Sequence, residues 1–251
     1  MDRLLEATAR AERDHFWFRG FRRFVEPFVR EATGGRPGAR ILDCGSGTGV
    51  NLPLLARHGR VVGIDLTWTG LAFARDRGER RVAQASATDL PFATATFHVV
   101  TSFDVIYALP DRDEAAALRE MHRVLRPGGH LVVNAAAMGL LRGNHSLLAG
   151  EIRRYTRGTL GARLTRAGFD VVRMTYTNAT ITPLVAGVRL AQRLTGHEES
   201  SQEISTPPAP VNAALTALLA VEAAALRFVN MPFGSSLLAL ARKRNQRTFT
   251  P

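Results

Sequence analysis

Lysine and cysteine are almost absent from this chain of 251 residues, which contains one of each, Lys243 and Cys44. A single cysteine excludes an intramolecular disulfide and gives no sign of an oxidising compartment. The first residues lack the apolar stretch of a signal peptide, so we expect a cytoplasmic protein. Because lysine occurs only at position 243, no Gly-Lys-Ser/Thr sequence exists, which excludes a P-loop nucleotide site. Histidines and carboxylates do not cluster at metal-ligand spacing, so we expect no metal site.

The charge is strongly positive, because 33 basic residues stand against 22 acidic ones and give a formal net charge of +11. Such a charge is compatible with a nucleic-acid partner or an anionic surface. The arginines, however, are scattered over every segment, and no basic stretch is interleaved with aromatic residues that could stack on bases. We therefore expect a small-molecule substrate and no nucleic-acid partner. The apolar stretch 211–229 contains Glu222 and much alanine, so we also expect no stable membrane insertion.

The most informative stretch is a series of alternate glycines directly after a short apolar segment, residues 41–49, Ile-Leu-Asp-Cys-Gly-Ser-Gly-Thr-Gly. Alternate glycines let the backbone turn tightly and approach a ligand closely. The helix-like stretch that follows, 51–57, would present free backbone N–H groups to that ligand. A second apolar segment ends at Asp65, 20 residues after Gly45. At this spacing nucleotide-binding α/β folds place a carboxylate on ribose hydroxyls.

The position after the last glycine indicates which kind of nucleotide is bound. A dinucleotide fingerprint, G-x-G-x-x-G counted from Gly45, needs glycine at position 50, where Val50 stands. The actual pattern, G-x-G-x-G two residues after Asp43, resembles the first motif of class I S-adenosylmethionine-dependent methyltransferases. Residues 84–92, 96–104 and 125–133 resemble further motifs of that family, in the family's order. Together these stretches cover residues 40–135 and resemble the methyltransferase type 11 family.

The resemblance implies a Rossmann-like α/β fold with a seven-stranded, mostly parallel sheet and helices on both faces. The alternation of strand and helix patterns after residue 38 indicates the same architecture. We expect strands near 39–43, 60–65, 81–85, 97–102 and 129–135, and a helix over 111–125 that is capped by Asp111 or Asp113. Four regions are expected: an N-terminal helical lid broken near Gly20 and Pro27 (1–38), the S-adenosylmethionine-binding core (39–176), a helical insertion that forms a cap or a dimer contact (177–236), and the final strand and tail (237–251).

Ligands of an open parallel sheet bind beyond the carboxyl ends of its strands. The resemblance places S-adenosylmethionine there. It implies that Asp65 holds the ribose hydroxyls, that Leu66 and Ala87 flank the adenine, and that Ser86 and Thr88 contact its polar edge. Many relatives have an acidic residue where Ser86 stands. The full set of implied cofactor contacts is Asp43, Gly45, Ser46, Gly47, Gly49, Asp65, Leu66, Ser86, Ala87, Thr88, Phe103 and Asp104.

The sequence indicates the residues that contact the substrate less clearly than those that contact the cofactor. One branch of the family has stretches similar to residues 12–20, 153–156, 167–169 and 176–183. The catalytic candidates are His145, Tyr107 and His15. The substrate-lining candidates are Trp17, Tyr107, His145, Glu151, Tyr155 and Asn178. Relatives often carry Glu-His where Tyr107-Ala108 stands and a histidine where Glu151 stands. His145 can equally be a surface histidine of a loop, and core packing competes with substrate contact at Trp17.

These features predict an enzyme that transfers a methyl group from S-adenosylmethionine to a small molecule, as in specialised-metabolite pathways. Oxygen is favoured over carbon or nitrogen as the acceptor atom, and a hydroxyl acceptor needs a general base. An alternative is a cyclase or rearrangement enzyme of the same fold that binds the same cofactor. An RNA methyltransferase ranks lower, and an intact cofactor motif argues against a non-catalytic subunit. Because the insertion can form a dimer contact, a homodimer is a further expectation.

Overall fold

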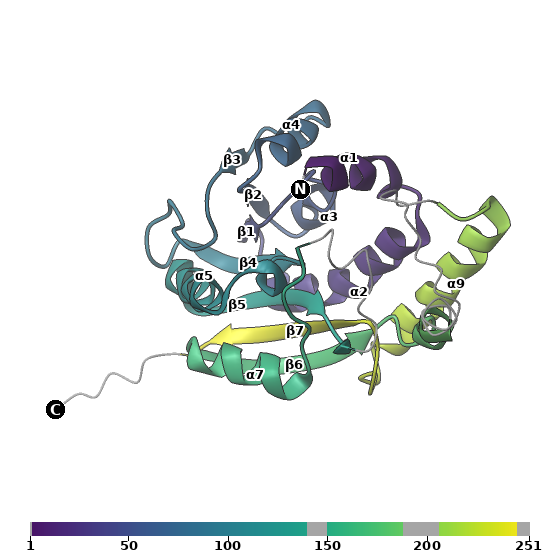
Figure 1. The fold of residues 1–251 in the computed structure, drawn as a ribbon. Helices are drawn as coiled ribbons and strands as arrows, with labels where there is room; N and C mark the ends of the chain where they lie inside the picture. Colours follow the sequence, from purple (N-terminus) through teal and green to yellow (C-terminus); the bar gives the residue numbers. More distant parts are fainter. Residues whose placement is uncertain (1, 140–149, 188–205, 245–251) are drawn as a thin grey trace.

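The computed structural model describes residues 2–139, 150–187 and 206–244 of the chain. Seven strands form one sheet in the order β3-β2-β1-β4-β5-β7-β6 (Figure 1). β1 to β5 are mutually parallel, and β7 runs antiparallel to both of its neighbours, β5 and β6. The predicted seven-stranded, mostly parallel sheet is confirmed. The strands are β1 (Arg40–Cys44), β2 (Arg60–Asp65), β3 (Val82–Gln84), β4 (Phe97–Phe103), β5 (Leu125–Ala136), β6 (Phe169–Thr177) and β7 (Ser236–Lys243).

The strand order reverses at β1, which pairs with β2 on one side and β4 on the other. In this register Asp43 of β1 lies opposite Gly63 of β2 and Thr101 of β4. Open parallel sheets bind ligands in the crevice outside the carboxyl ends of the strands at such a reversal. The fold therefore brings the loops after β1, β2, β3 and β4 to one edge of the sheet.

Helices cover both faces of the sheet (Figure 1). Leu118 and Met121 of α5 and Leu160 of α7 belong to one buried core with the facing strand residues. Phe28 of α2 and Leu219 of α9 belong to a second core on the opposite face. The helices are α1 (Asp2–Ala11), α2 (Phe16–Thr33), α3 (Leu52–Ala56), α4 (Trp68–Asp76), α5 (Asp111–Val124), α7 (Arg157–Arg166) and α9 (Ala209–Ala225). This three-layer arrangement buries near-continuous apolar strands, as parallel sheets require.

The N-terminal region forms two helices, but the predicted break near Gly20 and Pro27 is wrong. Both residues lie inside α2, and the chain breaks at residues 12–15 instead. A Cβ built on Gly20 would lie 2.4 Å from Cδ1 of Leu219 in α9. Gly20 therefore allows α2 and α9 to approach closely and does not mark a helix end. The sequence around Gly20 does not indicate this contact with a distant helix.

The predicted cap of α5 is also wrong. Pro110 occupies the N-cap position without a side-chain bond to the helix. Asp111 instead accepts ion pairs from Arg153 and Arg163, each at 3.0 Å. α5 ends at Val124 and β5 begins directly afterwards, four residues before the predicted strand. The family-like turn at residues 125–129 is thus already part of the sheet.

Within the insertion before β7, a buried carboxylate fixes α9 to the segment that directly follows β6. Glu222 of α9 is 1% exposed and accepts hydrogen bonds from the backbone N–H groups of Ala179 and Thr180, both at 2.9 Å. These hydrogen bonds explain why a carboxylate lies in the middle of an apolar helix. Of the predicted helix over 182–194, residues 182–187 are helical, and the rest, like the polar linker 196–203, lies outside the described residues. Within the described ranges, no helix is both long and apolar enough to cross a membrane.

Candidate functional site

Asp65 joins two loops at the carboxyl edge of the sheet. Its Oδ2 accepts a hydrogen bond from the backbone N–H of Gly47 at 2.8 Å. Its Oδ1 accepts from the N–H and the hydroxyl of Thr67 at 2.8 and 2.6 Å. A carboxylate has about four lone-pair sites, so these three bonds leave capacity for a ligand hydroxyl. Asp65 thus holds the glycine loop against the start of α4 and keeps an acceptor available at the edge.

The three loop glycines, Gly45, Gly47 and Gly49, have positive φ angles of 91°, 51° and 75°. A Cβ on Gly45 would lie 2.2 Å from Cγ2 of Val105, and one on Gly49 would lie 2.7 Å from Cβ of Ala74, so packing requires glycine at both. Nothing lies within 4 Å of the corresponding point at Gly47. The loop is therefore closely packed at its ends and open at its centre, as expected for close backbone approach to a ligand.

The remaining predicted cofactor residues differ in what they present to this edge. Leu66 is 67% exposed and so offers an apolar surface on which a flat ring can pack. Ser86 and Thr88 bond to each other through their hydroxyls at 2.7 Å and so fix the loop that carries Ala87. Ser46 is turned inward, because its buried Oγ would lie 2.9 Å from a Cβ on Gly63. Any contact from Ser46 to a ligand is therefore through its backbone.

Asp43 lies under the glycine loop and is buried, with 2% of its surface exposed. The hydroxyl of Thr101 donates to its Oδ1 at 2.6 Å. Burial raises the pKa of Asp43 to about 7; the Thr101 bond opposes this rise, and the charge of Asp65 adds to it. Asp43 therefore supports the loop from below and does not reach the open edge.

This raised pKa gives a pH-dependent prediction for stability. Between the ordinary aspartate pKa of about 3.9 and the folded value of about 7, the folded state binds a proton that the unfolded state has released. Stability therefore falls as pH rises through this window. We expect Asp43→Asn, which keeps an acceptor for Thr101 and never ionises, to gain up to about 4 kcal/mol over wild type at pH 8. Urea unfolding should show a clearly smaller difference at pH 5, and an equal difference at both pH values would contradict the assignment.

At the end of β4, Asp104 adopts a positive φ of 60° and is held by Asn134 of β5. The Asn134 side-chain amide donates to Asp104 Oδ1 at 2.9 Å, and Asn134 itself is buried. Protein packed around Asp104 raises the pKa of its carboxyl, but the side chain is solvent-exposed, so hydration offsets part of that rise. Phe103 is buried and packs edge-on against Phe21 of α2, with ring centroids 5.2 Å apart, so only its backbone can reach the edge. Sequence reasoning missed Asn134, whose signal was an amide in an otherwise apolar strand.

Tyr107, predicted as a catalytic residue, follows in the short 3₁₀ turn Ile106–Ala108. Burial raises the pKa of its hydroxyl well above the usual range, and the negative charges of Asp104 and Glu151 raise it further. The phenol therefore keeps its proton at neutral pH. It can donate a hydrogen bond but does not have the chemistry of a base.

The segment 151–155 packs against that turn. Glu151 is buried and pairs with Arg154, with Nε–Oε1 and Nη2–Oε2 distances of 2.5 and 3.0 Å. Tyr155 is 1% exposed, and its hydroxyl donates to the backbone oxygen of Ile106 at 3.3 Å. The prediction that Tyr155 lines the substrate site is not supported, because its ring belongs to the hydrophobic core. The pairing also explains the glutamate at 151, where relatives often have histidine.

The other substrate-side candidates have local structural roles. His15 caps α2, since its Nδ1 accepts the backbone N–H of Trp17 at 3.2 Å. Trp17 packs partly buried against the core under α2. Asn178 is buried with a φ of 65°, and its carbonyl accepts from Thr182 at the start of the next helical turn. His145 lies outside the described residues.

A buried ion pair ties the N-terminal region to the glycine loop. Glu12 is 1% exposed, pairs with Arg77 at the end of α4, and accepts the hydroxyl of Thr48 at 2.7 and 2.8 Å. Arg77 also donates to the backbone oxygens of Thr48 and Ala9, both at 3.2 Å. In the sequence, Glu12 is distinguished only as the first residue of the family-like stretch 12–20. The structure makes it the link between α1 and the loop that faces the ligand edge.

Removing this link should loosen the N-terminal region. Glu12→Ala leaves Arg77 without its carboxylate in a mostly buried position, so we expect a loss of about 3 kcal/mol in unfolding free energy. Hydrogen exchange should also accelerate in residues 2–15. The matched control is Glu26→Ala, which removes the more exposed pair with Arg57 and should cost less than about 1 kcal/mol. Equal losses in the two variants would contradict the anchoring role.

Comparison with known proteins identifies the central part of the chain, because residues 42–133 match the family model described as methyltransferase domain. The chain carries a methyltransferase domain. Over these residues the match confirms the sequence-based recognition of a class I S-adenosylmethionine-dependent methyltransferase domain, and with it the cofactor expected for such a domain. Among the described residues, the methyltransferase domain and its flanking segments contain no group of three or more metal-ligating side chains.

The similarity to curated proteins covers less than half of this chain. The ubiquinone/menaquinone biosynthesis C-methyltransferase UbiE of Vibrio parahaemolyticus is 38% identical in an alignment of 128 residues that covers 45% of this chain and 48% of that protein. The chain thus spans about half the length of the curated relatives it matches.

Solved structures share the fold over most of the chain. The [4+2]-cyclase SpnF aligns with a TM-score of 0.57 and 24% identity, covering 88% of this chain and 80% of the cyclase. An S-adenosylmethionine-dependent methyltransferase from Mesorhizobium loti aligns with a TM-score of 0.56 and 22% identity, covering 86% of this chain and 96% of that chain. At these identities, the likeness concerns the architecture alone.

Proposed function

We propose that this protein transfers a methyl group from S-adenosylmethionine to a small-molecule acceptor at the carboxyl edge of β1, β2 and β4. The observation that carries the proposal is the Asp65 carboxylate, held between Gly47 and Thr67 beside an open loop centre and an exposed Leu66. These features fit a nucleoside: a carboxylate for ribose hydroxyls, an apolar platform for adenine and free space for the chain between them. When bound, S-adenosylmethionine supplies an electrophilic methyl group on a positively charged sulfur.

The residues that we propose as cofactor contacts are those that the family resemblance implies and that lie at this edge. Asp65 accepts the ribose hydroxyls, while Leu66 and Ala87 flank the adenine. The backbone of Gly45 to Gly49 lines the middle of the site. Asp104, exposed at the end of β4, offers its carboxylate to the ammonium at the methionine end.

The same edge would position the acceptor. Orientation alone can contribute effective molarities of about 10⁵–10⁸ M, so a donor that fixes the acceptor matters even without proton transfer. Tyr107 is suited to this role, because its raised pKa keeps the phenol protonated. His145 and His15 are the candidates to take a proton from a hydroxyl acceptor. We also propose that the acceptor lies near Trp17, Glu151 and Asn178.

Oxygen remains the acceptor atom that we propose, as in the sequence-based prediction. Carbon is the nearest alternative, because the curated relatives are named as C-methyltransferases. A second candidate function is a cyclisation or rearrangement that needs the bound cofactor but no methyl transfer. It is favoured by the fold likeness to the [4+2]-cyclase and by the loss of the Glu-His pair at residues 107 and 108.

A homodimer through the insertion is a further part of the proposal. α9 and the loop after it expose five large apolar side chains, Val211, Leu218, Val221, Phe228 and Val229. Phe228 alone is 88% exposed. Apolar patches of this kind often mark interaction sites. Light scattering of the full chain in solution should give the molar mass of a dimer, and a monomer at all concentrations would contradict it.

The reaction is tested with S-adenosylmethionine that carries a deuterated methyl group. The protein is incubated with it and with a metabolite extract of its source cells, and products are compared by mass spectrometry. A labelled product, absent with Asp65→Ala, supports methyl transfer, and its fragmentation locates the acceptor atom. Unlabelled isomers that form only with cofactor and protein present would instead support the cyclase function.

A further inference from the structure

The edge of the sheet opposite the proposed cofactor site is strongly basic. Arg40 begins β1, Arg60 begins β2, Arg80 and Arg81 precede β3, Arg126 lies at the start of β5, and Arg242 lies near the end of the antiparallel β7. The arginines look scattered in the sequence. The parallel topology gathers them, because β1, β2, β3 and β5 all start at the same edge.

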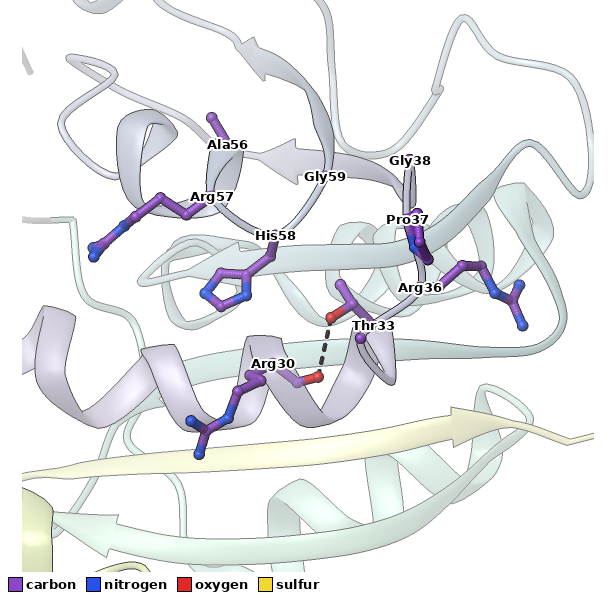
Figure 2. A pocket seen from close by; sticks show the side chains of 10 residues that line it. Arg30, Thr33, Arg36, Pro37, Gly38, Ala56, Arg57, His58 and Gly59 are labelled. Carbon is purple, nitrogen blue, oxygen red and sulfur yellow. Dashed lines mark hydrogen bonds between the residues drawn. The ribbon is translucent and has the colours of Figure 1, made fainter.

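Two cavities open on this edge, and both include Thr33 and Arg36. The first has a volume of about 370 Å³, and Figure 2 shows Arg30, Arg57 and His58 around it. The second has a volume of about 550 Å³ and is lined by Arg36, His98, Arg126 and His130, among others. It lies between the end of α2 and the starts of β4 and β5.

Two hydrogen-bond donors meet in the larger cavity. The backbone N–H of Arg40 donates to Nδ1 of His98 at 2.9 Å, so Nδ1 is an acceptor and the proton of the neutral ring is on Nε2. Nη1 of Arg126 lies 3.2 Å from that Nε2. Arginine has no hydrogen-bond acceptor, so in this contact two hydrogen-bond donors face each other. A ligand oxygen that lies beside both nitrogens would accept a hydrogen bond from each.

The charges around His98 favour an anion. Burial lowers the pKa of His98, and the positive charges of Arg126, Arg36 and Arg40 lower it further. The pKa of His130 is lowered by burial and by Arg242. Glu31 is the one carboxylate that lines the larger cavity. In the smaller cavity, Arg57 is already paired with Glu26 at 3.3 Å.

We propose that the larger cavity binds a small phosphate-bearing molecule, whose oxygen accepts hydrogen bonds from His98 and Arg126 while Arg36 supplies a second positive charge. The cavity size suits a compact organic phosphate. A membrane surface or single-stranded RNA is less suited, because none of the large apolar side chains exposed in the described ranges lines either cavity. Such side chains would be needed for insertion or for stacking on bases.

The test is a titration of the full chain with inorganic pyrophosphate, followed through the histidine ring resonances by NMR. We expect saturable shifts of His98 and an upward shift of its pKa, because a bound anion stabilises the charged ring. Arg126→Gln and the exposed Arg36→Gln should each weaken binding by about tenfold or more. Arg227→Gln, at the end of α9, is the matched control and should change nothing.

The outcomes separate the sources of the phosphate. Competition by a soluble phosphate ester or by a short-chain phospholipid shows which headgroup fits the cavity. Binding of an RNA oligonucleotide without any response to pyrophosphate would overturn the proposal, as would non-saturable shifts or equal losses in Arg227→Gln. None of these measurements requires methyl transfer, so they test this site independently of the proposed reaction.

Discussion

Asp65→Ala is expected to weaken S-adenosylmethionine binding at least about 100-fold, because charge-assisted bonds to two ribose hydroxyls contribute roughly 1.5–3 kcal/mol each. The variant also releases the backbone N–H of Gly47 and Thr67, which the carboxylate holds at 2.8 Å. Both effects act on the same edge of the sheet. Isothermal titration calorimetry of the purified variant with the cofactor measures the loss.

The control for this variant is Asp76→Ala, which removes an exposed carboxylate at the end of α4. It should bind the cofactor as wild type does. Asp65→Asn separates charge from shape, because the amide keeps one acceptor oxygen and loses the negative charge. Wild-type affinity in Asp65→Ala would show that Asp65 does not bind the ribose of the cofactor.

Gly47→Ala is expected to lower cofactor affinity about tenfold or more, an effect of at least 1.4 kcal/mol, with only a modest cost to folding. The added Cβ meets no protein atom within 4 Å, so it enters the space that we assign to the ligand. The positive φ of 51° is strained for any residue with a Cβ and costs about 1–2 kcal/mol. Calorimetry for binding and urea unfolding for stability measure the two effects separately.

Gly34→Ala is the matched control, because Gly34 has a φ of 58° and also has nothing within 4 Å of its Cβ position. It caps α2 at the opposite edge of the sheet. The two variants should lose similar stability, and only Gly47→Ala should lose affinity. If both bind the cofactor like wild type, the space at Gly47 is not part of the site.

The strands and the cofactor loop could be predicted because their signals are local. Apolar runs, alternate glycines and the interval to Asp65 fix β1, β2 and the loop between them within a short stretch of chain. The match over residues 42–133 covers this same region. The sequence was sufficient to predict a part of the site where the site residues and the strand or loop that positions them lie close together in the chain.

The features that were missed depend on contacts between distant residues. Glu12 reaches Thr48 across 36 positions, and the anchoring of Glu222 to Thr180 spans 42. The basic edge arises because the starts of separate strands converge, which no window of sequence displays. Tyr155 looked like a site residue because it stands in a family-like motif, yet the fold places its ring in the core.

Hydrogen exchange of the full chain with and without S-adenosylmethionine reports both whether the cofactor binds and where on the fold it binds. On cofactor binding we expect slower exchange in residues 43–49, 65–67, 86–88 and 103–107, and no change in residues 33–38 at the opposite edge. Unchanged exchange at the carboxyl edge, or protection confined to the basic edge, would contradict the proposed cofactor site.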